Sequence, residues 1–483
     1  MKILFAASEV APFAKTGGLA DVAGSLPTAL ASLGHDVRVV MPRYRQVEQK
    51  AFDLKPVATF SVPLGAWNER CDVFQHTKNT NVMVYFIGKD IFFDRPELYG
   101  TAKADYPDNA ERFIFFSRAI LELCLSLDFN PDIVHCNDWQ TGLVPLYLEK
   151  FYRASKVLSY TKTVFTIHNL GYQGIFPLGD FRLTGLDWDV FTPDGIEFWG
   201  KINLLKAGLV YSDVITTVSK TYSREIQTTE YGNGLEGVLA KRSKDIYGIV
   251  NGIDYRAYDP ASDLAISKTF SASKPAGKLI CKQALQKTVG LPVTDDPFMG
   301  MVTRLADQKG LDILVDALPE IMSLDVQIMI LGTGDEKYHR ILADEARRYH
   351  SRMSVLLQYN EQIAKNIYSG CDLFLMPSRY EPCGLGQMIA LRYGTVPLVR
   401  KTGGLADTVA DYKPKTGQGS GFLFKEYSAQ ALTHCLRRAI NVYRDREKWK
   451  CLMQTGMKQD FSWEHSAAEY VKIYKMAMEK KQG

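Results

Sequence analysis

One seven-residue string occurs twice in the chain, and its residue types are suited to binding an anion. Lys15-Thr-Gly-Gly-Leu-Ala-Asp21 recurs as Lys401-Thr-Gly-Gly-Leu-Ala-Asp407, each between a predicted strand and a predicted helix. Glycines at such a turn let a ligand approach the backbone, and a helix N-terminus favours negative charge. Paired glycines also simply permit a tight turn. Because the string is duplicated we favour anion binding, with Lys15, Gly17, Gly18, Asp21, Thr402, Gly403 and Gly404 as candidates.

A second loop carries two cations at a spacing that matches a diphosphate. Arg304 and Lys309 lie five residues apart after a predicted strand, and the string Gly-Thr-Gly-Asp at 332–335 follows the next strand. An Arg and a Lys in front of a helix are also commonly solvated surface charges. Neither a Walker loop nor a GxGxxG fingerprint accompanies them, which argues against an ATPase or a dinucleotide-dependent dehydrogenase.

A carboxylate follows another predicted strand, in the string Arg379-Tyr-Glu-Pro-Cys-Gly-Leu385. Glu381 in a rigid loop could accept hydrogen bonds from sugar hydroxyls. It could equally cap the following helix. Cys383 in the same string could be only a small buried hydrophobic residue.

Polar and aromatic residues also end two predicted strands in the first half of the chain. His135-Cys-Asn-Asp138-Trp139-Gln and Thr-Ile-His168-Asn both end predicted strands, so we expect their polar side chains to project into the interdomain cleft. An indole beside carboxylates is a common platform for sugars. The alternatives are that His168 is a buried core histidine and that Trp139 serves only for packing.

These loops need a scaffold, and the hydrophobic pattern supplies one. Apolar runs of strand length alternate with helical periods, as in parallel βαβ units. Gly34 is positioned to end a helix over 19–33 in the left-handed conformation. We therefore expect an α/β fold with two doubly wound, Rossmann-like domains facing a deep interdomain cleft. The predicted strands are 2–8, 37–41, 133–136, 164–168 and 214–218 in one series, and 298–303, 326–331, 373–376 and 396–399 in the other.

Turn formers and helical periodicity set the expected domain limits. The turn-rich stretch near residue 250 predicts a hinge at 246–256, between an N-terminal domain at 1–245 and a C-terminal domain at 257–460. The last segment, 461–483, has apolar residues at helical spacing and is expected to pack back on the first domain as an amphipathic helix.

Composition excludes several classes of protein. The 483 residues are 46% hydrophobic and 23% charged, as in ordinary globular chains. A net charge of +4 is too small to indicate a nucleic-acid or membrane partner. The eight cysteines form no CxxC pair and no zinc-ligand spacing, so we expect reduced thiols, no metal site and a cytoplasmic location. Glu9 interrupts the N-terminal apolar run, which argues against a signal peptide.

Taken together, these strings resemble bacterial glycogen synthases and plastidial starch synthases, the fifth family of glycosyltransferases. The resemblance spans almost the whole chain. It is carried by SEVAPFAKTGGLADV at 8–22, RPELYG and YPDNAERF within 95–113, HCNDWQ, FTIHNLGYQG, KAGLVYSDVITTVS at 206–219, GIVNGID, TRLADQKGLD, EPCGLGQ and KTGGLADTV.

The resemblance implies a GT-B architecture and transfer of glucose, with retention, from ADP-glucose to the non-reducing end of glycogen or another α-1,4-glucan. ADP-glucose would be a substrate, and no cofactor or metal would be needed. Arg304 and Lys309 would hold the diphosphate, with Lys15 and the Gly17-Gly18 turn approaching it across the closed cleft. The remaining implied contacts are Asp138, His168 and Asn251 to the glucose, Glu381, Cys383, Gly384 and Leu385 from the other wall, and Tyr99 near the nucleotide or the glucan.

Two positions depart from related patterns. Residue 386 is Gly where Thr or Ser is common, and Ile389 stands where related GT-B families carry a second Glu. This makes Glu381 less plausible as a nucleophile, and we favour front-face transfer, in which the leaving phosphate accepts the proton of the acceptor hydroxyl. Losing Lys309 is then expected to lower turnover at least about 100-fold with the fold intact.

The sequence is also compatible with three other functions. The chain could be a GT-B transferase that uses UDP-glucose, or a sucrose-forming relative. It could be a catalytically silent glucan-binding protein on the same scaffold, although Lys15, Arg304, Lys309 and Glu381 are all present. It could also be a two-lobed solute-binding protein, which would ordinarily need an export signal.

Overall fold

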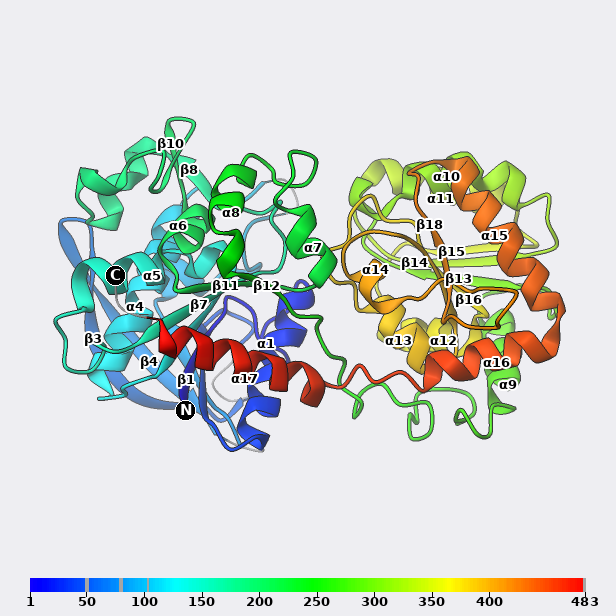
Figure 1. Cartoon of the computed structure of the whole chain (residues 1–483), viewed down its shortest axis with the longest axis horizontal. Coiled ribbons are helices and arrows are strands. Elements are labelled where there is room, and N and C mark those ends of the chain that lie inside the picture. The colour runs from blue at the N-terminus through cyan, green and yellow to red at the C-terminus, as the bar shows by residue number, and fades with distance from the viewer. Residues whose placement is uncertain (48–51, 78–80, 102–103, 481–483) are drawn as a thin grey trace. The chain divides into compact units, whose positions relative to one another are not determined.

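The chain folds into two compact units, each with its own sheet (Figure 1). The computed structural model describes residues 1–47, 52–77, 81–101 and 104–480. The first unit comprises Met1–Val218, Ser223–Gly252 and Trp463–Gly483, and the second comprises Ser219–Tyr222 and Ile253–Ser462.

The first unit is built on a mostly parallel sheet of nine strands in the order β12-β11-β7-β6-β1-β2-β5-β4-β3. Only β3 and β4 are antiparallel to their neighbours. The strands are β1 (Lys2–Ala6), β2 (Asp36–Pro42), β3 (Lys55–Leu64), β4 (Trp67–His76), β5 (Met83–Gly88), β6 (Ile133–Asn137), β7 (Lys162–Ile167), β11 (Val214–Thr217) and β12 (Ile246–Gly248).

Helices and a small second sheet complete the first unit. The sheet has the order β8-β10-β9, from β8 (Ile175–Pro177), β9 (Glu197–Phe198) and β10 (Lys201–Asn203). The helices of the N-terminal half of the chain are α1 (Gly18–Ser32), α3 (Asp90–Phe93), α4 (Asn109–Ser126), α5 (Leu143–Tyr147), α6 (Leu204–Tyr211), α7 (Lys220–Glu225) and α8 (Glu236–Lys241). The last helix, α17 (Trp463–Glu479), packs beside α1 and also contacts β7 (Figure 1).

The second unit has a fully parallel sheet of six strands in the order β15-β14-β13-β16-β17-β18. These are β13 (Phe298–Val302), β14 (Gln327–Leu331), β15 (Met353–Leu356), β16 (Leu373–Met376), β17 (Val396–Arg400) and β18 (Phe422–Phe424). Its helices are α9 (Gly277–Thr288), α10 (Leu311–Ile321), α11 (Glu336–Arg348), α12 (Glu361–Gly370), α13 (Gly386–Arg392), α14 (Gly403–Thr408), α15 (Ala429–Arg444) and α16 (Arg446–Met457).

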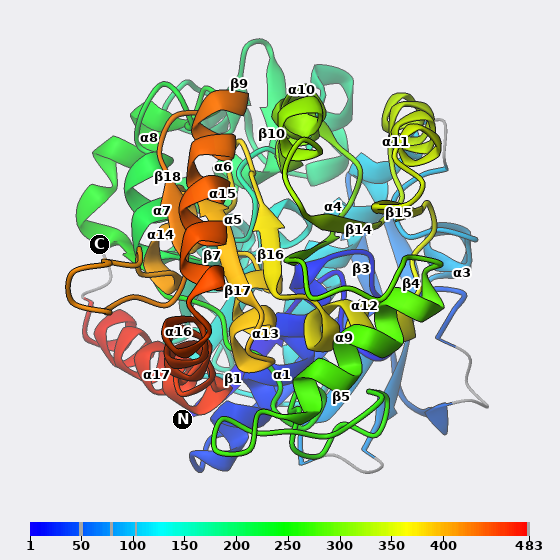
Figure 2. The same ribbon diagram turned by 90° about the vertical axis from the view of Figure 1, so that its right-hand side faces the viewer.

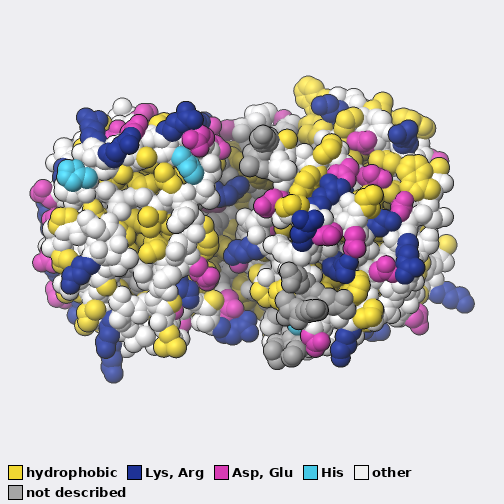
Figure 3. All heavy atoms as spheres, turned by 180° about the vertical axis from the view of Figure 1, so that it is seen from behind, with side chains coloured by type: hydrophobic (Ala, Val, Ile, Leu, Met, Phe, Trp, Pro, Cys, Tyr) yellow, Lys and Arg dark blue, Asp and Glu magenta, His cyan; other side chains and the backbone are white. Residues whose placement is uncertain are grey.

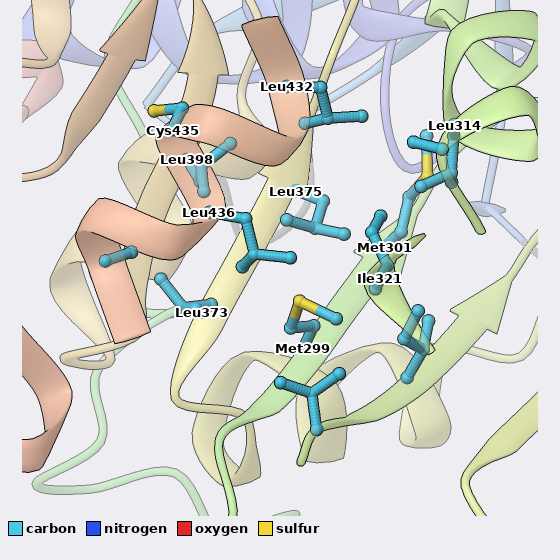
Figure 4. Close-up of a cluster of buried hydrophobic side chains, with 14 of the residues drawn as sticks. Met299, Met301, Leu314, Ile321, Leu373, Leu375, Leu398, Leu432, Cys435 and Leu436 are labelled. Atoms are coloured by element: carbon cyan, nitrogen blue, oxygen red, sulfur yellow. The ribbon is translucent and has the colours of Figure 1, made fainter. Parts of the chain in front are cut away.

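Burial on both faces explains why the strands of the second unit are continuous apolar runs. Helices α10 and α15 lie on one face, and α12 and α13 lie on the other (Figures 1 and 2). On the first face Met299, Leu375 and Leu398 of the strands meet Leu314 of α10 and Leu436 of α15 (Figure 4). This packed core fixes the strand ends from which the candidate loops emerge.

Each sheet has a topological switch point, which is a strand whose two neighbours are connected to it in opposite directions across the sheet. In the first unit β1 lies between β2 and β6, and in the second β13 lies between β14 and β16. Ligands of doubly wound folds bind outside the carboxyl ends of the strands at such a point. The loops after β1, β6, β13 and β16 are therefore the places to look for a site.

The sequence-based predictions of the elements are largely confirmed. All nine predicted strands are present, with ends that differ by at most two residues, and Gly34 ends α1 with φ +86°. The antiparallel strands β3 and β4 and the small sheet were not predicted. Residues 246–248 of the predicted hinge form β12, and the chain passes to the second unit between Gly252 and Ile253.

The surface agrees with the small net charge. On the face shown in Figure 3, described Lys and Arg side chains alternate with Asp and Glu over both units. Within the residues that the structure describes, no helix is long and apolar enough to cross a membrane.

Candidate active site

In the second unit, the loops after β13 and β16 are packed tightly against each other. Gly310 ends the first loop with φ +72°, and a Cβ there would lie 2.0 Å from the carbonyl oxygen of Pro377. The backbone N–H of Arg379 donates to the carbonyl of Gln308 at 2.8 Å. The glycine thus allows a close approach that brings the ends of the two loops together.

This packing joins the two charged residues that the sequence singled out in these loops. Lys309 Nζ lies 3.0 Å from Oε1 and 2.7 Å from Oε2 of Glu381, and the hydroxyl of Ser378 donates to Oε2 at 3.1 Å. The side chains are only 16% and 7% exposed. Glu381 does not cap the following helix: α13 begins at Gly386 with no side-chain cap, so that alternative is wrong.

Arg304 lies on the same loop but is exposed. The next residue, Leu305, donates its N–H to the carbonyl of Thr333 at 2.9 Å, so the 332–335 loop lies alongside, as expected. Lys309 is therefore held by both oxygens of Glu381, and the backbone beside Arg304 is fixed by the hydrogen bond of Leu305.

The second copy of the repeated string is part of the same loop cluster. Gly403 has φ +44°, and a Cβ on it would lie 1.9 Å from the carbonyl oxygen of Glu381. A Cβ on Gly404 would lie 2.1 Å from the carbonyl oxygen of Cys383. The N–H of Gly404 donates to the carbonyl oxygen of Glu381 at 3.1 Å. In the second copy of the string, close packing alone requires both glycines, whether or not they also bind an anion.

The neighbouring candidates are also fixed by local packing. Thr402 and Cys383 are buried, and Leu385 is half-buried at the N-cap position of α13. Gly384 has φ +73°, a conformation that favours glycine. The structure thus gathers Arg304, Lys309, Glu381, Cys383, Gly384, Leu385, Thr402, Gly403 and Gly404 into contiguous loops at one sheet edge of the second unit.

In the first unit, the first copy of the string already holds an anion of the protein itself. The buried carboxylate of Glu9 accepts the N–H of Thr16 at 2.5 Å, the N–H of Gly17 at 3.1 Å and the hydroxyl of Thr16 at 2.6 Å. Two of the N–H groups expected to face a ligand are therefore used internally. A Cβ on Gly17 would nevertheless meet nothing within 4 Å, unlike its counterpart in the second copy.

The charged ends of this string pair with each other. Lys15 Nζ lies 2.6 Å from Oδ1 of Asp21, and both side chains remain partly exposed. Burial raises the pKa of Asp21 above its ordinary value, although Lys15 opposes this effect. Lys15 is thus positioned at the start of α1, and Gly18 is the first residue of that helix.

Tyr99 supports the same loop. Its hydroxyl donates to Oε1 of Glu9 at 2.8 Å and lies 2.8 Å from the hydroxyl of Ser8. Burial, with the nearby charge of Glu9, raises its pKa well above 10. Tyr99 therefore holds the carboxylate of Glu9 in place, a contact that the sequence did not predict.

Asp138 and His168 come together at the ends of β6 and β7. The N–H of His168 donates to Oδ1 of Asp138 at 2.8 Å. Asp138 has φ +56°, a strained conformation for a residue with a side chain and one found often at functional sites. Burial raises the pKa of Asp138 to about 7.

The protonation of His168 follows from its neighbours. Asn137 Nδ2 donates to the carbonyl of Ala6 at 3.0 Å, which turns Oδ1 of Asn137 toward Nε2 of His168, 2.9 Å away. Nε2 must then carry the proton. Burial lowers the pKa of His168 to about 3, so the ring is neutral and Nδ1 is a hydrogen-bond acceptor.

Two other residues of these strand ends do not belong to the edge. His135 is fully buried, with Nδ1 2.8 Å from the hydroxyl of Tyr474 and Nε2 2.6 Å from that of Thr166. Trp139 is only 9% exposed and packs on Phe113, so it does not offer an open face to a sugar. The expectation that His135 projects from its strand end is wrong, and Trp139 follows the alternative of simple packing.

Asn251 lies at the end of the first unit, away from regular structure. Its side chain is buried, and Oδ1 has no hydrogen-bond partner among the described residues. A buried polar atom without a partner is costly unless a ligand or water satisfies it. This is a property expected of a binding residue.

Sequence reasoning missed three supporting residues, namely Glu9, Asn137 and Ser378. The only signal for Glu9 was an acid inside an otherwise apolar run directly after a strand. Among the described residues, no group of three or more His, Cys, Asp or Glu side chains is arranged to hold a metal ion.

Comparisons with known proteins identify these two doubly wound units, with polar loops at their switch points, as a glycosyltransferase of the GT-B class. Residues 2–241 match the family model for the starch synthase catalytic domain, and residues 283–451 match that for group 1 glycosyl transferases. A glycogen synthase of Geotalea daltonii is 50% identical over 483 residues, with complete coverage of both chains, and one of Thermotoga maritima is 47% identical with 99% coverage of each. This chain belongs to the family of bacterial glycogen synthases and starch synthases.

Solved structures lead to the same conclusion about the fold. The catalytic domain of starch synthase IV from Arabidopsis thaliana, bound to ADP and acarbose, is 35% identical, covers 99% of both chains and has a TM-score of 0.91. A sucrose-phosphate synthase from Thermosynechococcus elongatus is 17% identical with a TM-score of 0.61 over 98% of both chains, a likeness of fold alone.

Proposed function

We propose that this chain transfers glucose from ADP-glucose to the non-reducing end of an α-1,4-glucan, with retention at the anomeric carbon. The observation that carries the proposal is the largely shielded Lys309–Glu381 ion pair, which fixes an ammonium group at the switch point of the second unit. The ADP found in the starch synthase IV structure supports an adenine nucleotide as the donor.

Cations at this edge suit the leaving group. Rupture of the bond from the anomeric carbon to phosphate leaves negative charge on ADP and positive charge on the sugar. Arg304 supplies positive charge, and Lys309, whose charge Glu381 balances, supplies a fixed N–H donor on the same loop. A preorganised donor of this kind is worth about 2.7–4 kcal/mol in the transition state. We expect these residues to serve in place of a metal ion, and we expect no cofactor.

The contacts of Glu381 support front-face transfer. Both of its carboxylate oxygens are bound by Lys309, and Ser378 donates to one of them. A carboxylate engaged in this way is a weak nucleophile, so its proposed role is to position Lys309. The phosphate of the departing ADP then takes the proton of the acceptor hydroxyl. A covalent glucosyl adduct trapped on an acid such as Asp138 would overturn this route.

The first unit supplies groups suited to a glucosyl residue. Neutral His168 offers Nδ1 as an acceptor, Asp138 titrates near neutral pH, and Asn251 has an unsatisfied amide oxygen. Uncharged or weakly charged acceptors of this kind can bind hydroxyl groups without repelling a phosphate. We propose all three as ligands of the transferred glucose, with Cys383, Gly384 and Leu385 as further contacts.

The proposal is tested by supplying the chain with glycogen and either ADP-[14C]glucose or UDP-[14C]glucose. We expect label from ADP-glucose in precipitated polymer and an equal amount of released ADP, with much less label from UDP-glucose. We also expect full activity in EDTA. If only UDP-glucose is used, the donor assignment fails. Loss of activity in EDTA that magnesium restores would contradict the role given to Arg304 and Lys309.

A further inference from the structure

A tryptophan stands at the tip of a tight hairpin in the first unit, where that residue type is out of place. Strands β9 and β10 are joined by only Trp199 and Gly200, with φ values of +56° and +74°. Two-residue turns with positive φ at both positions favour Asn, Asp or Gly, because these tolerate the left-handed conformation. Trp199 therefore costs backbone energy that a smaller residue would avoid.

Packing within the chain does not account for this choice. The Trp199 side chain is 81% exposed, and its one ring contact among the described residues is an edge-on approach to Phe198, with centroids 6.0 Å apart. A large exposed aromatic ring in a strained turn adds little to stability. Strain that the fold does not need is a reason to look for a ligand.

The hairpin forms one wall of a pocket of about 630 Å³, a volume typical of small-molecule sites. Helices α6 and α8 supply the other walls, near the top of the first unit in Figure 1. Gly234 lets the chain pass close to the aromatic wall, since a Cβ there would lie 3.0 Å from the ring of Phe198. None of the lining residues is among those assigned to glucosyl transfer.

The polar groups of the pocket are already paired and carry little net charge. Lys241 forms an ion pair with Asp194 at 2.8 Å, and Arg242 forms one with Asp245 at 2.9 Å. Lys206 donates to the carbonyls of Pro193 and Glu197. Among the described residues Lys206 has only carbonyl partners, and the carboxylate of Glu197 accepts the N–H of Gly200 at 2.7 Å, so these two residues add one charge of each sign and no excess that would select a phosphorylated or a cationic ligand.

An indole beside paired carboxylates and ammonium groups suits a neutral polyhydroxylated ligand. The C–H face of a pyranose packs on an aromatic ring, and its hydroxyls exchange hydrogen bonds with charged groups at the rim. The proposed substrate and product is a polymer of such units. We propose that the pocket bounded by Phe198, Trp199, Asp194, Glu197 and Lys241 is a second site, which binds a segment of α-glucan remote from the end that reacts.

This inference rests on the proposed function, because it takes the polymer substrate as the ligand. A second contact raises the effective concentration of chain ends without altering the chemistry. The second site should therefore lower the KM for glycogen but not the KM for an acceptor of three glucose units. Such a short acceptor cannot reach the second site while its end occupies the reacting position.

The test compares Trp199→Asn with wild type. Asn is suited to positive φ, so this variant should be at least as stable. We expect glycogen retention in affinity electrophoresis to weaken about three- to tenfold and the KM for glycogen to rise by a similar factor. The kcat, the KM for maltotriose and the affinity for ADP should not change. Trp199→Tyr, which keeps an aromatic face, should retain most of the binding.

The matched control is Tyr160→Asn, which removes an aromatic ring that is 82% exposed and does not line the pocket. It should behave as wild type. Unchanged glycogen retention and KM in Trp199→Asn would overturn the second site while leaving the proposed function intact. A wild-type chain that transfers no glucose to glycogen would instead overturn the proposed function. Glycogen retention by that chain, lost in Trp199→Asn, would still support the pocket.

Discussion

Glu381 is buried and Lys309 is half-buried, so removing either charge leaves the other without its partner in a largely desolvated contact. Their ammonium and carboxylate groups meet at 2.7 Å, with little solvent access. Removing one partner of a buried pair typically costs about 3–5 kcal/mol, because the other is left uncompensated. Lys309→Ala is therefore expected to lower stability as well as activity, and a second variant is needed to separate the two effects.

We predict that Lys309→Ala lowers kcat at least about 100-fold and also lowers the free energy of unfolding by about 3 kcal/mol. The double variant Lys309→Met with Glu381→Gln should recover most of the stability without recovering activity. Turnover and urea unfolding measured on both variants separate the two effects. Near-normal turnover in either would remove Lys309 from the chemistry.

Asp138 makes stability depend on pH in a direction that is unusual for an aspartate. Its pKa is about 7 in the folded chain and near 3.9 in an unfolded one. Between these values the folded chain holds the extra proton, so the free energy of unfolding falls as pH rises from about 4 to 7 and is level above that.

We predict that Asp138→Asn stabilises the chain at pH 8 by at least about 2 kcal/mol, with a smaller gain at pH 5.5 and none near pH 4. Urea unfolding at these pH values measures the effect. Asp128→Asn is the control, because Asp128 also has a positive φ, +48°, but is exposed. An equal gain at all pH values would show that the carboxyl of Asp138 is not the cause.

At the scale of elements, the two copies of the repeated string have diverged in what their glycines do. Gly403 is pressed against the carbonyl of Glu381, whereas the space beside Gly17 is open. Gly17 has φ −148°, which any residue adopts. The first copy therefore keeps a glycine that the fold itself does not require.

We predict that Gly17→Ala changes the free energy of unfolding by less than about 1 kcal/mol yet lowers transferase activity, since a methyl group would obstruct an anion at this turn. Gly403→Ala should destabilise by several kcal/mol, in line with overpacking and positive φ. Thermal unfolding and the ADP-glucose assay measure both. Full activity in Gly17→Ala would mean that no ligand approaches there.

The strands and their terminal loops were predictable because buried parallel strands are continuous apolar runs with turn signals after them. Placing Arg304, Lys309 and Glu381 at the same sheet edge followed from that pattern. The ion pair itself did not, because it joins residues 72 positions apart through a loop contact that Gly310 permits.

Side-chain direction at a strand end was the main limit of sequence reasoning. His135 and Asn137 lie two residues apart on β6, yet one packs against Tyr474 of α17 and the other binds His168. Tyr474, which contacts Nδ1 of His135, is 339 residues away in the sequence, and no local pattern predicts that contact. Glu9 was missed for a related reason, since its partners are backbone N–H groups.

At the scale of the whole molecule, the chain leaves its first unit at Gly252, builds the second unit and returns with α17. Residues of this helix, including Tyr470, Tyr474 and Ala477, are buried against the first unit. The stability of the first unit thus depends on a helix that follows the second unit in the sequence, although the second unit has a core of its own.

We predict that Tyr474→Phe lowers the stability of the first unit alone, by about 1–3 kcal/mol, because Nδ1 of buried His135 loses its partner. Hydrogen exchange should quicken at amides of β6 and β7 and stay unchanged at β13 and β14, since the units have separate cores. Met476→Ala, on an exposed face of the same helix, is the control and should alter neither set. Faster exchange in both sheets would instead mean that the two units unfold as one, and that α17 secures the whole chain.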